Sequence, residues 1–331
     1  MGVAVDVSGN LYIGTYQGGP TYGEVVGVTA TTQNISYAAP TFFGFGAAGL
    51  VADGAGNLYF TNNDLVQVGK VSVSAGVITI TSVTTVAGGG SGCSQQTDSL
   101  GDDCPATSAV LNGPAGVALD ASGNLYIADS HNNRIRKVTA PLTNGVISTV
   151  AGNGTAGFID NISATNAELN YPIALAVDSS GNLYITDQRN NRIRKVSVST
   201  GNISTVAGKG PSNCVDVCGP FSGDGGPATS AQLNAAAGIA VDSSGNLYIA
   251  DGDDYRVRKV DTSGIITTVA GIGPSCQGLS CNGQYGGFSG DGGDATHAAL
   301  NLPTGVAVDA FGNLYIADSG NNRIRMVSKS K

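Results

Sequence analysis

The six cysteines are the residues of this sequence best suited to redox or metal chemistry. They form three pairs that are close in sequence, Cys93 with Cys104, Cys214 with Cys218, and Cys276 with Cys281. A structural zinc site needs four converging ligands, but these pairs lie in three different loops with no histidine close by in the sequence. An even number of cysteines paired within loops is typical of disulfides. We therefore predict three loop disulfides and an oxidising compartment, extracellular or periplasmic; free thiols or zinc ligands are the alternative.

Other residue types that could catalyse a reaction are few or scattered. The chain has two histidines, His131 and His297, so a metal site of three histidines is impossible. No Ser-His-Asp or Cys-His arrangement typical of nucleophilic catalysis stands out. The Gly-Asp-Gly-Gly segments that start at Gly223 and Gly290 lack the alternating carboxylates of a calcium loop and read better as turns. We predict no catalytic residue, no metal and no cofactor, and we favour a non-enzymatic protein.

A repeat supplies the elements that must position these residues. Residues 124–138 read NLYIADSHNNRIRKV, and further copies start at Asn10, Asn57, Asn182, Asn246 and Asn313, of which the first two are degenerate. A chain with six copies of one supersecondary unit is a repeat protein, in which each unit buries its apolar face against its neighbours.

Each unit reads as four short strands. In the third unit, residues 116–120 are small, a Gly-Asn turn follows, and residues 125–129 alternate between two faces. Residues 134–138 and 146–150 supply a third and a fourth strand. The first strand is built from Gly, Ala and Val, which suits a place where strands converge on an axis. Because four-stranded units repeated around a channel form a propeller, we predict an all-β, six-bladed β-propeller with four-stranded antiparallel blades.

We expect a single domain, with blades at approximately 2–38, 49–87, 116–152, 174–208, 238–271 and 305–327. The sixth unit ends after its third strand, so we predict that the last blade lacks its outer strand and exposes an edge that can pair with another strand. A fused domain or a neighbouring molecule would donate that strand; the alternative is a boundary of the sequence. Because the chain opens inside an innermost strand without a secretory signal, we expect Met1 to begin a domain taken from a longer protein.

The repeat resembles a known family. The pattern G-V-A-V-D-x-x-G-N-L-Y-I-A-D-x-x-N-N-R-I-R-K-V, followed by I-x-T-V-A-G and G-D-G-G-x-A-T-x-A-x-L-N-x-P, is similar to the NHL repeat. The resemblance covers nearly the whole chain and implies a six-bladed propeller. It implies little about function, since NHL domains occur in enzymes and in adhesion, signalling and RNA-binding proteins.

Enzymes of this fold hold metals at the channel mouth, just before the innermost strands. Zinc-dependent lyases use histidines there, and calcium-dependent lactonases use Glu, Asn and Asp. The corresponding positions here are apolar or small: Ala47, Ala48, Ala115, Ile173, Ala237 and Thr304. A hydrolase or lyase, lactonase-like or amidating-lyase-like with a divergent site, is therefore our second hypothesis and not our first.

Two sets of aspartates are interpreted as structural. One aspartate follows the innermost strand in all six units, where it would cap a turn by accepting backbone N–H groups. A second set ends the second strand in the units that carry two arginines, and blades one and two lose both partners together. We therefore predict Asp–Arg pairs that hold each hairpin, namely Asp129 with Arg134, Asp187 with Arg192, Asp251 with Arg256, and Asp318 with Arg323.

Strand direction places the long linkers and the loops between second and third strands on one side of the disc. Polar and aromatic residues gather there, as in surfaces that bind protein or carbohydrate. The predicted face comprises His131, Asn132, Asn133, Arg189, Asn190, Asp253, Asp254, Tyr255, Asn321, Asn322, Phe158, Phe221, Tyr285 and Phe288. The alternative is that the Asn pairs are only good turn formers.

Charge and hydropathy exclude other partners. The formal net charge of −8 argues against a nucleic-acid-binding surface. No apolar run approaches the ~18–20 residues needed to span a bilayer, so we expect no direct membrane insertion. We predict a secreted, non-catalytic binding or scaffold module for a protein or carbohydrate ligand.

Overall fold

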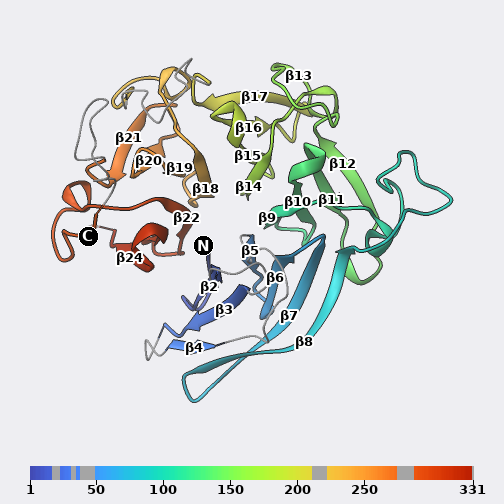
Figure 1. Ribbon diagram of the computed structural model, residues 1–331, viewed down its shortest axis with the longest axis horizontal. Coiled ribbons are helices and arrows are strands. Elements are labelled where there is room, and N and C mark those ends of the chain that lie inside the picture. The colour runs from blue at the N-terminus through green and yellow to red at the C-terminus, as the bar shows by residue number, and fades with distance from the viewer. Residues whose placement is uncertain (17–22, 31–34, 38–48, 211–221, 274–286, 330–331) are drawn as a thin grey trace.

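The computed structural model describes residues 1–331 except 17–22, 31–34, 38–48, 211–221, 274–286 and 330–331. Six antiparallel sheets stand around a central axis like the blades of a propeller (Figure 1). In the described ranges, the helical segments are eight 3-10 turns of three residues each. The prediction of an all-β, six-bladed propeller is confirmed.

The strands follow one another from the axis to the rim in every blade. Blade one contains β1 (Gly2–Val5), β2 (Leu11–Tyr16), β3 (Gly23–Val28) and β4 (Ile35–Tyr37), and blade two contains β5 (Leu50–Ala52), β6 (Asn57–Asn62), β7 (Leu65–Ser74) and β8 (Val77–Gly88). Blade three contains β9 (Pro114–Leu119), β10 (Leu125–Asp129), β11 (Arg134–Val138) and β12 (Ile147–Ala151).

The second half of the ring repeats this order. Blade four contains β14 (Pro172–Val177), β15 (Leu183–Asp187), β16 (Arg192–Val196) and β17 (Asn202–Ala207), and β13 (Ile162–Ser163) adds a fifth, two-residue strand to its outer edge. Blade five contains β18 (Ala236–Val241), β19 (Leu247–Asp251), β20 (Arg256–Val260) and β21 (Ile266–Ala270). Blade six contains β22 (Pro303–Val308), β23 (Leu314–Asp318) and β24 (Arg323–Val327), so within the described residues it has three strands, as expected.

The eight short helical turns lie in the connections. They are η1 (Ala106–Ser108), η2 (Ser130–Asn132), η3 (Leu142–Asn144), η4 (Ala164–Asn166), η5 (Gln188–Asn190), η6 (Ala228–Ser230), η7 (Ala295–His297) and η8 (Ser319–Asn321). Four of them, η1, η4, η6 and η7, occupy the linkers that join one blade to the next, and η2, η5 and η8 form the loops between second and third strands.

Small residues let the innermost strands approach one another around the axis. A Cβ on Gly116 would come within 2.5 Å of the carbonyl oxygen of Ile173 on the next blade, so no larger residue fits there without movement. The ring closes where β1 contacts β22. There the Met1 ammonium donates to Thr304 Oγ1 at 3.2 Å, and the Thr304 hydroxyl donates back to the Met1 carbonyl at 2.8 Å.

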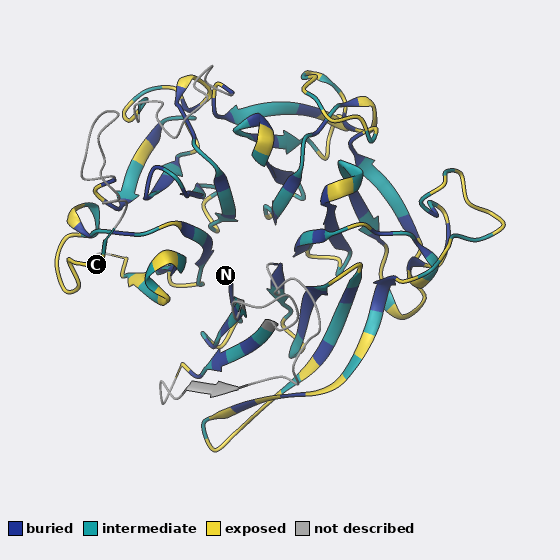
Figure 2. Cartoon of the chain, in the orientation of Figure 1, coloured by how far each residue is buried: buried dark blue, intermediate teal, exposed yellow. Residues whose placement is uncertain are grey.

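The core is divided among the seams between blades. In the seam between blades two and three, Tyr59 and Val66 pack with Leu125 and Ile127 of the next blade. Figure 2 shows buried residues along the strands and exposed ones at turns and linkers. Each blade therefore depends on its neighbour for burial, as expected for a repeat protein.

The turn aspartates cap their turns as predicted. In blade three, Asp120 Oδ1 accepts from the backbone N–H groups of Ser122 and Asn124, and Oδ2 accepts from the Asn124 amide and the Tyr126 hydroxyl. Partial burial alone would raise the pKa of Asp120, but these hydrogen bonds outweigh it and hold the pKa below its ordinary value.

Candidate binding face at the channel mouth

Linker ends and the loops between second and third strands meet on one side of the disc, as the strand directions predicted. In blade three, the N–H of Asn112 in the linker donates to Asp129 Oδ1 at 2.8 Å, and the N–H of His131 donates to the Asn112 carbonyl at 3.1 Å. The same two bonds recur in blade four, where Asn170 bonds Asp187 and Arg189. In both blades, hydrogen bonds therefore join the linker to the loop between the second and third strands.

Most of the predicted asparagines are used to build these loops. Asn132 and Asn321 donate from their side-chain amides to the aspartate that ends the second strand, at 2.9 and 2.8 Å. The buried Asn190 does the same at 2.8 Å and also donates to the Gly157 carbonyl. Asn133 and Asn322 adopt the left-handed conformation that ends a tight turn. These contacts favour the turn-forming interpretation for the asparagines.

The predicted Asp–Arg pairs need a correction, because each aspartate binds the second arginine of the motif and not the first. The pairs seen are Asp129 with Arg136 at 3.3 Å, Asp187 with Arg194 at 2.9 Å, Asp251 with Arg258 at 3.3 Å, and Asp318 with Arg325 at 3.4 Å. The first arginines, Arg134, Arg192, Arg256 and Arg323, donate instead to backbone carbonyls of nearby loops.

The strand register explains why Asp129 binds the second arginine, Arg136, and not the first, Arg134. Arg134 lies directly opposite Asp129 at the strand end, and its long side chain extends past that end to the Asn153 carbonyl. Arg136 lies two residues further into the sheet, and its stem reaches back so that the guanidinium meets the carboxylate where both are buried. Burial raises the pKa of Asp129, while bonds from Asn132, Asn112 and Arg136 act in the opposite direction.

A second aspartate, which was not predicted from the sequence, also binds each of these arginines. Arg136 also bonds Asp102 at 2.5 Å, Arg194 bonds Asp160 at 3.1 Å, and Arg258 bonds Asp224 at 2.7 Å. Each linker aspartate precedes the arginine that it binds by 34 residues. For Asp224 the signal in the sequence was the Gly-Asp-Gly-Gly segment, which we interpreted as a turn, whereas Asp102 and Asp160 lie in the different sequences Gly-Asp-Asp and Ile-Asp-Asn.

Two of the predicted aromatic residues pack on the arginines. The Phe158 ring lies 3.8 Å from the Arg192 guanidinium carbon and 4.8 Å from that of Arg194. The Phe288 ring lies 3.9 Å from Arg323 and 4.9 Å from Arg325. Each ring therefore has a cation–π role inside its own blade, while about two fifths of its surface remains exposed. Phe221 and Tyr285 lie outside the described residues.

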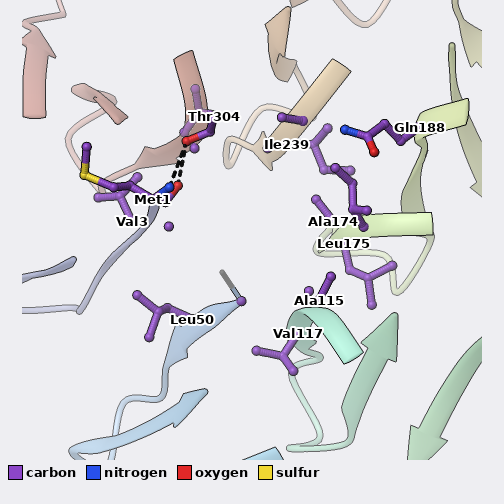
Figure 3. Close-up of a pocket in the computed structure, with 18 of the residues that line it drawn as sticks. Met1, Val3, Leu50, Ala115, Val117, Ala174, Leu175, Gln188, Ile239 and Thr304 are labelled. Carbon is purple, nitrogen blue, oxygen red and sulfur yellow. Dashed lines mark hydrogen bonds between the residues drawn. The ribbon is translucent and has the colours of Figure 1, made fainter. Parts of the chain in front are cut away.

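A cavity of about 400 Å³ opens at the axis (Figure 3). As expected from the sequence, Ala115, Ile173, Ala237 and Thr304 line it, together with apolar side chains such as Leu50 and Ile239. Ala47 and Ala48 lie outside the described residues. Figure 3 shows Gln188 at one side of the cavity with its amide turned toward it. The wall is therefore mainly apolar, with polar groups at a few places on the rim.

Among the described residues, Tyr171 is the one aromatic side chain that lines the cavity, and it was not predicted from the sequence. It has a φ of +57°, which is uncommon for a bulky residue, and its N–H donates to Asn133 Oδ1 at 2.9 Å. His131 meets its ring edge-on at 5.3 Å, and the Arg189 guanidinium lies over its face at 4.4 Å. The available signal was Asn-Tyr-Pro, where the equivalent segments read Asn-Gly-Pro, Asn-Ala-Ala and Asn-Leu-Pro.

Blade five departs from its neighbours in the same loop. Asp254 takes the place of the amide of Asn132 or Asn190, so that two carboxyl groups face each other where an amide otherwise donates to a carboxylate. Burial raises the pKa of Asp254, and burial together with the charge of Asp254 raises the pKa of Asp251. The Asn234 amide compensates in part by donating to Asp254 Oδ1 at 2.8 Å. Asp253 is half-buried and Tyr255 is buried.

One predicted disulfide is present in the described residues. Cys93 and Cys104 are bonded, with Cα atoms 5.8 Å apart, in the linker that precedes blade three. Cys214, Cys218, Cys276 and Cys281 lie outside the described residues. Within the described part of the chain, no group of three metal-ligating His, Cys, Asp or Glu side chains occurs, and no helix there is both long enough and apolar enough to cross a bilayer.

Solved structures of similar architecture are only distantly related in sequence. An auxiliary nutrient binding protein from Bacteroides ovatus aligns over 97% of this chain and 66% of its own, with a TM-score of 0.65 and 17% identity. A putative phosphatase from Bacteroides thetaiotaomicron aligns over all of this chain and 71% of its own, with a TM-score of 0.63 and 15% identity. At these identities the likeness shows the fold alone.

Sequence relatives are closer. Teneurin-4 of Mus musculus is 36% identical over 257 residues, and human Teneurin-1 is 34% identical over 257 residues; each match covers 74% of this chain and 9% of the relative. The chain thus spans about a tenth of the length of these relatives. The NHL repeat profile matches residues 169–196 and 300–325, and the teneurin NHL domain profile matches residues 3–158 and 198–286. This chain belongs to the teneurin NHL domain family.

Proposed function

We propose that this propeller is a secreted, non-catalytic recognition module that binds a protein or carbohydrate ligand on the face where the linkers surround the channel mouth. A teneurin-type NHL propeller supports a binding or scaffold role in general. The Cys93–Cys104 disulfide is compatible with an extracellular location, and we infer that the remaining cysteines are bonded within their linkers in the same way.

The single observation that carries the proposal is the cluster of Tyr171, His131 and Arg189. His131 and Arg189 are exposed, and they enclose an aromatic ring that the left-handed backbone of Tyr171 directs to the channel mouth. Among the described residues, no carboxylate pairs with Arg189. A guanidinium stacked on a tyrosine keeps its edge available for hydrogen bonds to a planar acceptor. In a chain of net charge −8, this local positive site favours a ligand that presents a carboxylate.

The test compares binding by the native chain with binding by Tyr171→Ala and Arg189→Ala. The probes are arrayed neutral and carboxylate-bearing oligosaccharides and arrayed extracellular protein domains. A matched control is Phe311→Ala, since Phe311 is an exposed aromatic residue in the β22–β23 turn, at the opposite ends of the strands. We expect each of the first two changes to weaken binding at least ~10-fold, as for a residue that anchors an interface, and Phe311→Ala to leave it unchanged.

The result that would overturn the proposal is a ligand whose affinity is insensitive to Tyr171→Ala and Arg189→Ala. Loss of binding in Phe311→Ala would overturn it too, because the turn face would then carry the recognition. Circular dichroism of each variant establishes that the propeller is intact before binding is measured.

A further inference from the structure

Blade four departs from the repeat at three positions around the channel mouth, namely Gln188, Arg189 and Tyr171. The equivalent residues of blades three, five and six are, in the same order, Ser130, Gly252 and Ser319, then His131, Asp253 and Gly320, then Gly113, Ala235 and Leu302. At each position blade four has the largest side chain of the four blades. The channel mouth is therefore asymmetric, although the repeat that builds it is regular.

Gln188 offers a side-chain amide to the cavity. Among the described residues, neither its amide oxygen nor its amide nitrogen makes a hydrogen bond, and Figure 3 shows the amide turned toward the cavity. The hydroxyls at the equivalent positions are occupied. Ser130 donates to the Pro172 carbonyl at 2.6 Å. Ser319 is hydrogen-bonded to Thr304. Because a free amide carries both donors and an acceptor, Gln188 can bond the N–H or the carbonyl of a ligand's peptide group.

Arg189 places a positive charge beside the same cavity. Its guanidinium lies over the ring of Tyr171, 4.4 Å from the ring centre, and Tyr171 is part of the cavity lining. The Arg189 side chain is exposed, and the described lining contains no aspartate or glutamate. A carboxylate at the rim would therefore meet a guanidinium with which it can form two parallel hydrogen bonds, and no negative charge on the cavity wall.

The cavity itself suits an apolar group. Its volume of about 400 Å³ lies toward the small end of the range for ligand sites. Leu50, Ile173 and Ile239 contribute to its wall. An aliphatic group that enters is removed from water, which favours binding in proportion to the apolar area that is buried. The site therefore combines a cation, an unpaired amide and an apolar hollow.

We propose that the channel mouth binds the C-terminus of a partner polypeptide that ends in an aliphatic residue. The terminal carboxylate binds Arg189, the last peptide group bonds the Gln188 amide, and the last side chain enters the cavity. Capture of a terminal carboxylate is a recurring mode of peptide recognition. This inference rests on the proposed function and deepens it, because it names the ligand class for the same site.

Two other sources of a carboxylate fit the site less well. An acidic carbohydrate has no aliphatic side chain to fill the apolar cavity. A free N-acyl amino acid has the carboxylate, the amide and the side chain, but it leaves His131 unused. The exposed His131 lies outside the cavity lining and meets the Tyr171 ring edge-on at 5.3 Å. The site therefore continues outward, where the residues that precede a C-terminus would lie.

The test measures binding of the whole protein to labelled peptides by fluorescence anisotropy. The probes are Gly-Ser-Gly-Ser-Leu with a free C-terminal carboxylate, the same peptide with a C-terminal amide, and Gly-Ser-Gly-Ser-Ser with a free carboxylate. We expect the first peptide to bind at least ~10-fold more tightly than either of the others, because each of these lacks either the charged acceptor or the buried aliphatic side chain. Unlabelled N-acetyl-leucine should compete, but more weakly than the unlabelled first peptide.

Arg189→Ala should weaken binding of the free-acid peptide at least ~10-fold and leave the affinity of the amidated peptide unchanged. Lys209→Ala is the matched control, because it removes the same charge from an exposed position in the linker that follows blade four; it should change neither affinity. Gln188→Ser copies blades three and six and should weaken both peptides ~5-fold. Ala237→Ile copies Ile173 of blade four into the cavity and should weaken the leucine peptides ~10-fold, because it fills the space that the leucine would enter.

The inference is overturned if the free and amidated peptides bind alike or if Arg189→Ala weakens both of them equally. It is also overturned if Ala237→Ile leaves the affinity unchanged while circular dichroism shows an intact propeller, or if N-acetyl-leucine competes as well as the peptide. If no peptide binds but a ligand from the arrays still requires Tyr171 and Arg189, this inference fails and the proposed function stands. If that ligand is insensitive to both changes, the proposed function fails as well.

Discussion

Blades two and three place different side chains at two equivalent positions. In blade three, Asp129 ends the second strand, and Arg136 of the third strand lies opposite Ile127. Their side chains form a buried ion pair at 3.3 Å. Blade two has Asn62 and Gln67, whose amides hydrogen-bond at 2.9 Å. The joint loss of both charges in blade two preserves the contact in neutral form, since either charge alone would be buried without its partner.

Blade two stabilises its outer half by other means. Its β7–β8 hairpin extends well beyond the rim (Figure 1), and Ile78 from that hairpin is fully buried against Tyr12 and Val25 of blade one. In blades three to five, the arginine of the third strand is instead bound to a linker aspartate. The comparison shows that the outer half of a blade can be held by an extended apolar hairpin or by an arginine between two carboxylates.

The largest expected effect comes from removing the arginine alone. Arg194→Ala leaves Asp187 buried without its cation and Asp160 without its partner. We expect a loss of ~3–5 kcal/mol in the free energy of unfolding, as for a buried ion pair that loses one member. The measurement is the urea midpoint together with the slope of the transition, which shows whether one cooperative unit still unfolds.

The matched control copies blade two into blade four. In Asp187→Asn with Arg194→Gln, neither charge is left buried, so we expect at least half of that loss to be recovered. If the double variant is as unstable as Arg194→Ala, the arginine acts mainly through the packing of its stem and the equivalence of the two blades is wrong.

These contacts also show what could be predicted from the sequence. The fold follows from local signals: Leu125 and Ile127 alternate with Tyr126, and the small residues around Gly116 mark the innermost strand. The sequence does not show which arginine binds the aspartate, because Arg134 and Arg136 are two residues apart and therefore lie on the same face of the sheet. To predict which of the two arginines binds Asp129, one must know how far each side chain extends relative to the end of the strand.

The linker aspartates and Tyr171 were missed for different reasons. Asp102 meets Arg136 across 34 residues of sequence, and local periodicity carries no information about such a contact. Tyr171 occupies a position that other blades fill with Gly113, Ala235 or Leu302, all with positive φ. A departure from the repeat at a strained backbone position is a signal that comparison of the blades can detect.

Blade five offers a second comparison, between a carboxyl and an amide in the same loop. Asp254 is only 4% exposed and faces Asp251, where Asn190 in blade four donates to Asp187. Because the folded-state pKa of Asp254 is raised, the folded chain holds a proton that the unfolded chain releases above about pH 4. Stability from this group is therefore complete below that pH and is lost as the pH rises through the folded-state value.

We expect Asp254→Asn to stabilise the protein at pH 7 by ~1–2 kcal/mol, since it removes a like-charge contact and restores an amide donor. The gain should vanish below about pH 4, where the native carboxyl is protonated in both states. Urea midpoints between pH 3 and 8 check this. Asn190→Asp in blade four is the reverse change and should destabilise increasingly with pH; a gain from Asp254→Asn that is the same at every pH contradicts the assignment.

The smallest expected change in stability comes from an aromatic contact that blade four has and blade three lacks. Phe158 stacks on Arg192 and Arg194, whereas in the described residues no aromatic ring lies over Arg136. Phe158→Leu should therefore lower the urea midpoint by an amount equivalent to ~0.5–1 kcal/mol, which is the range for a partly exposed cation–π contact. Phe311→Leu, at an exposed turn position, should change stability by less than ~0.5 kcal/mol. Equal losses in the two variants would mean that the ring over the arginines contributes only its apolar surface.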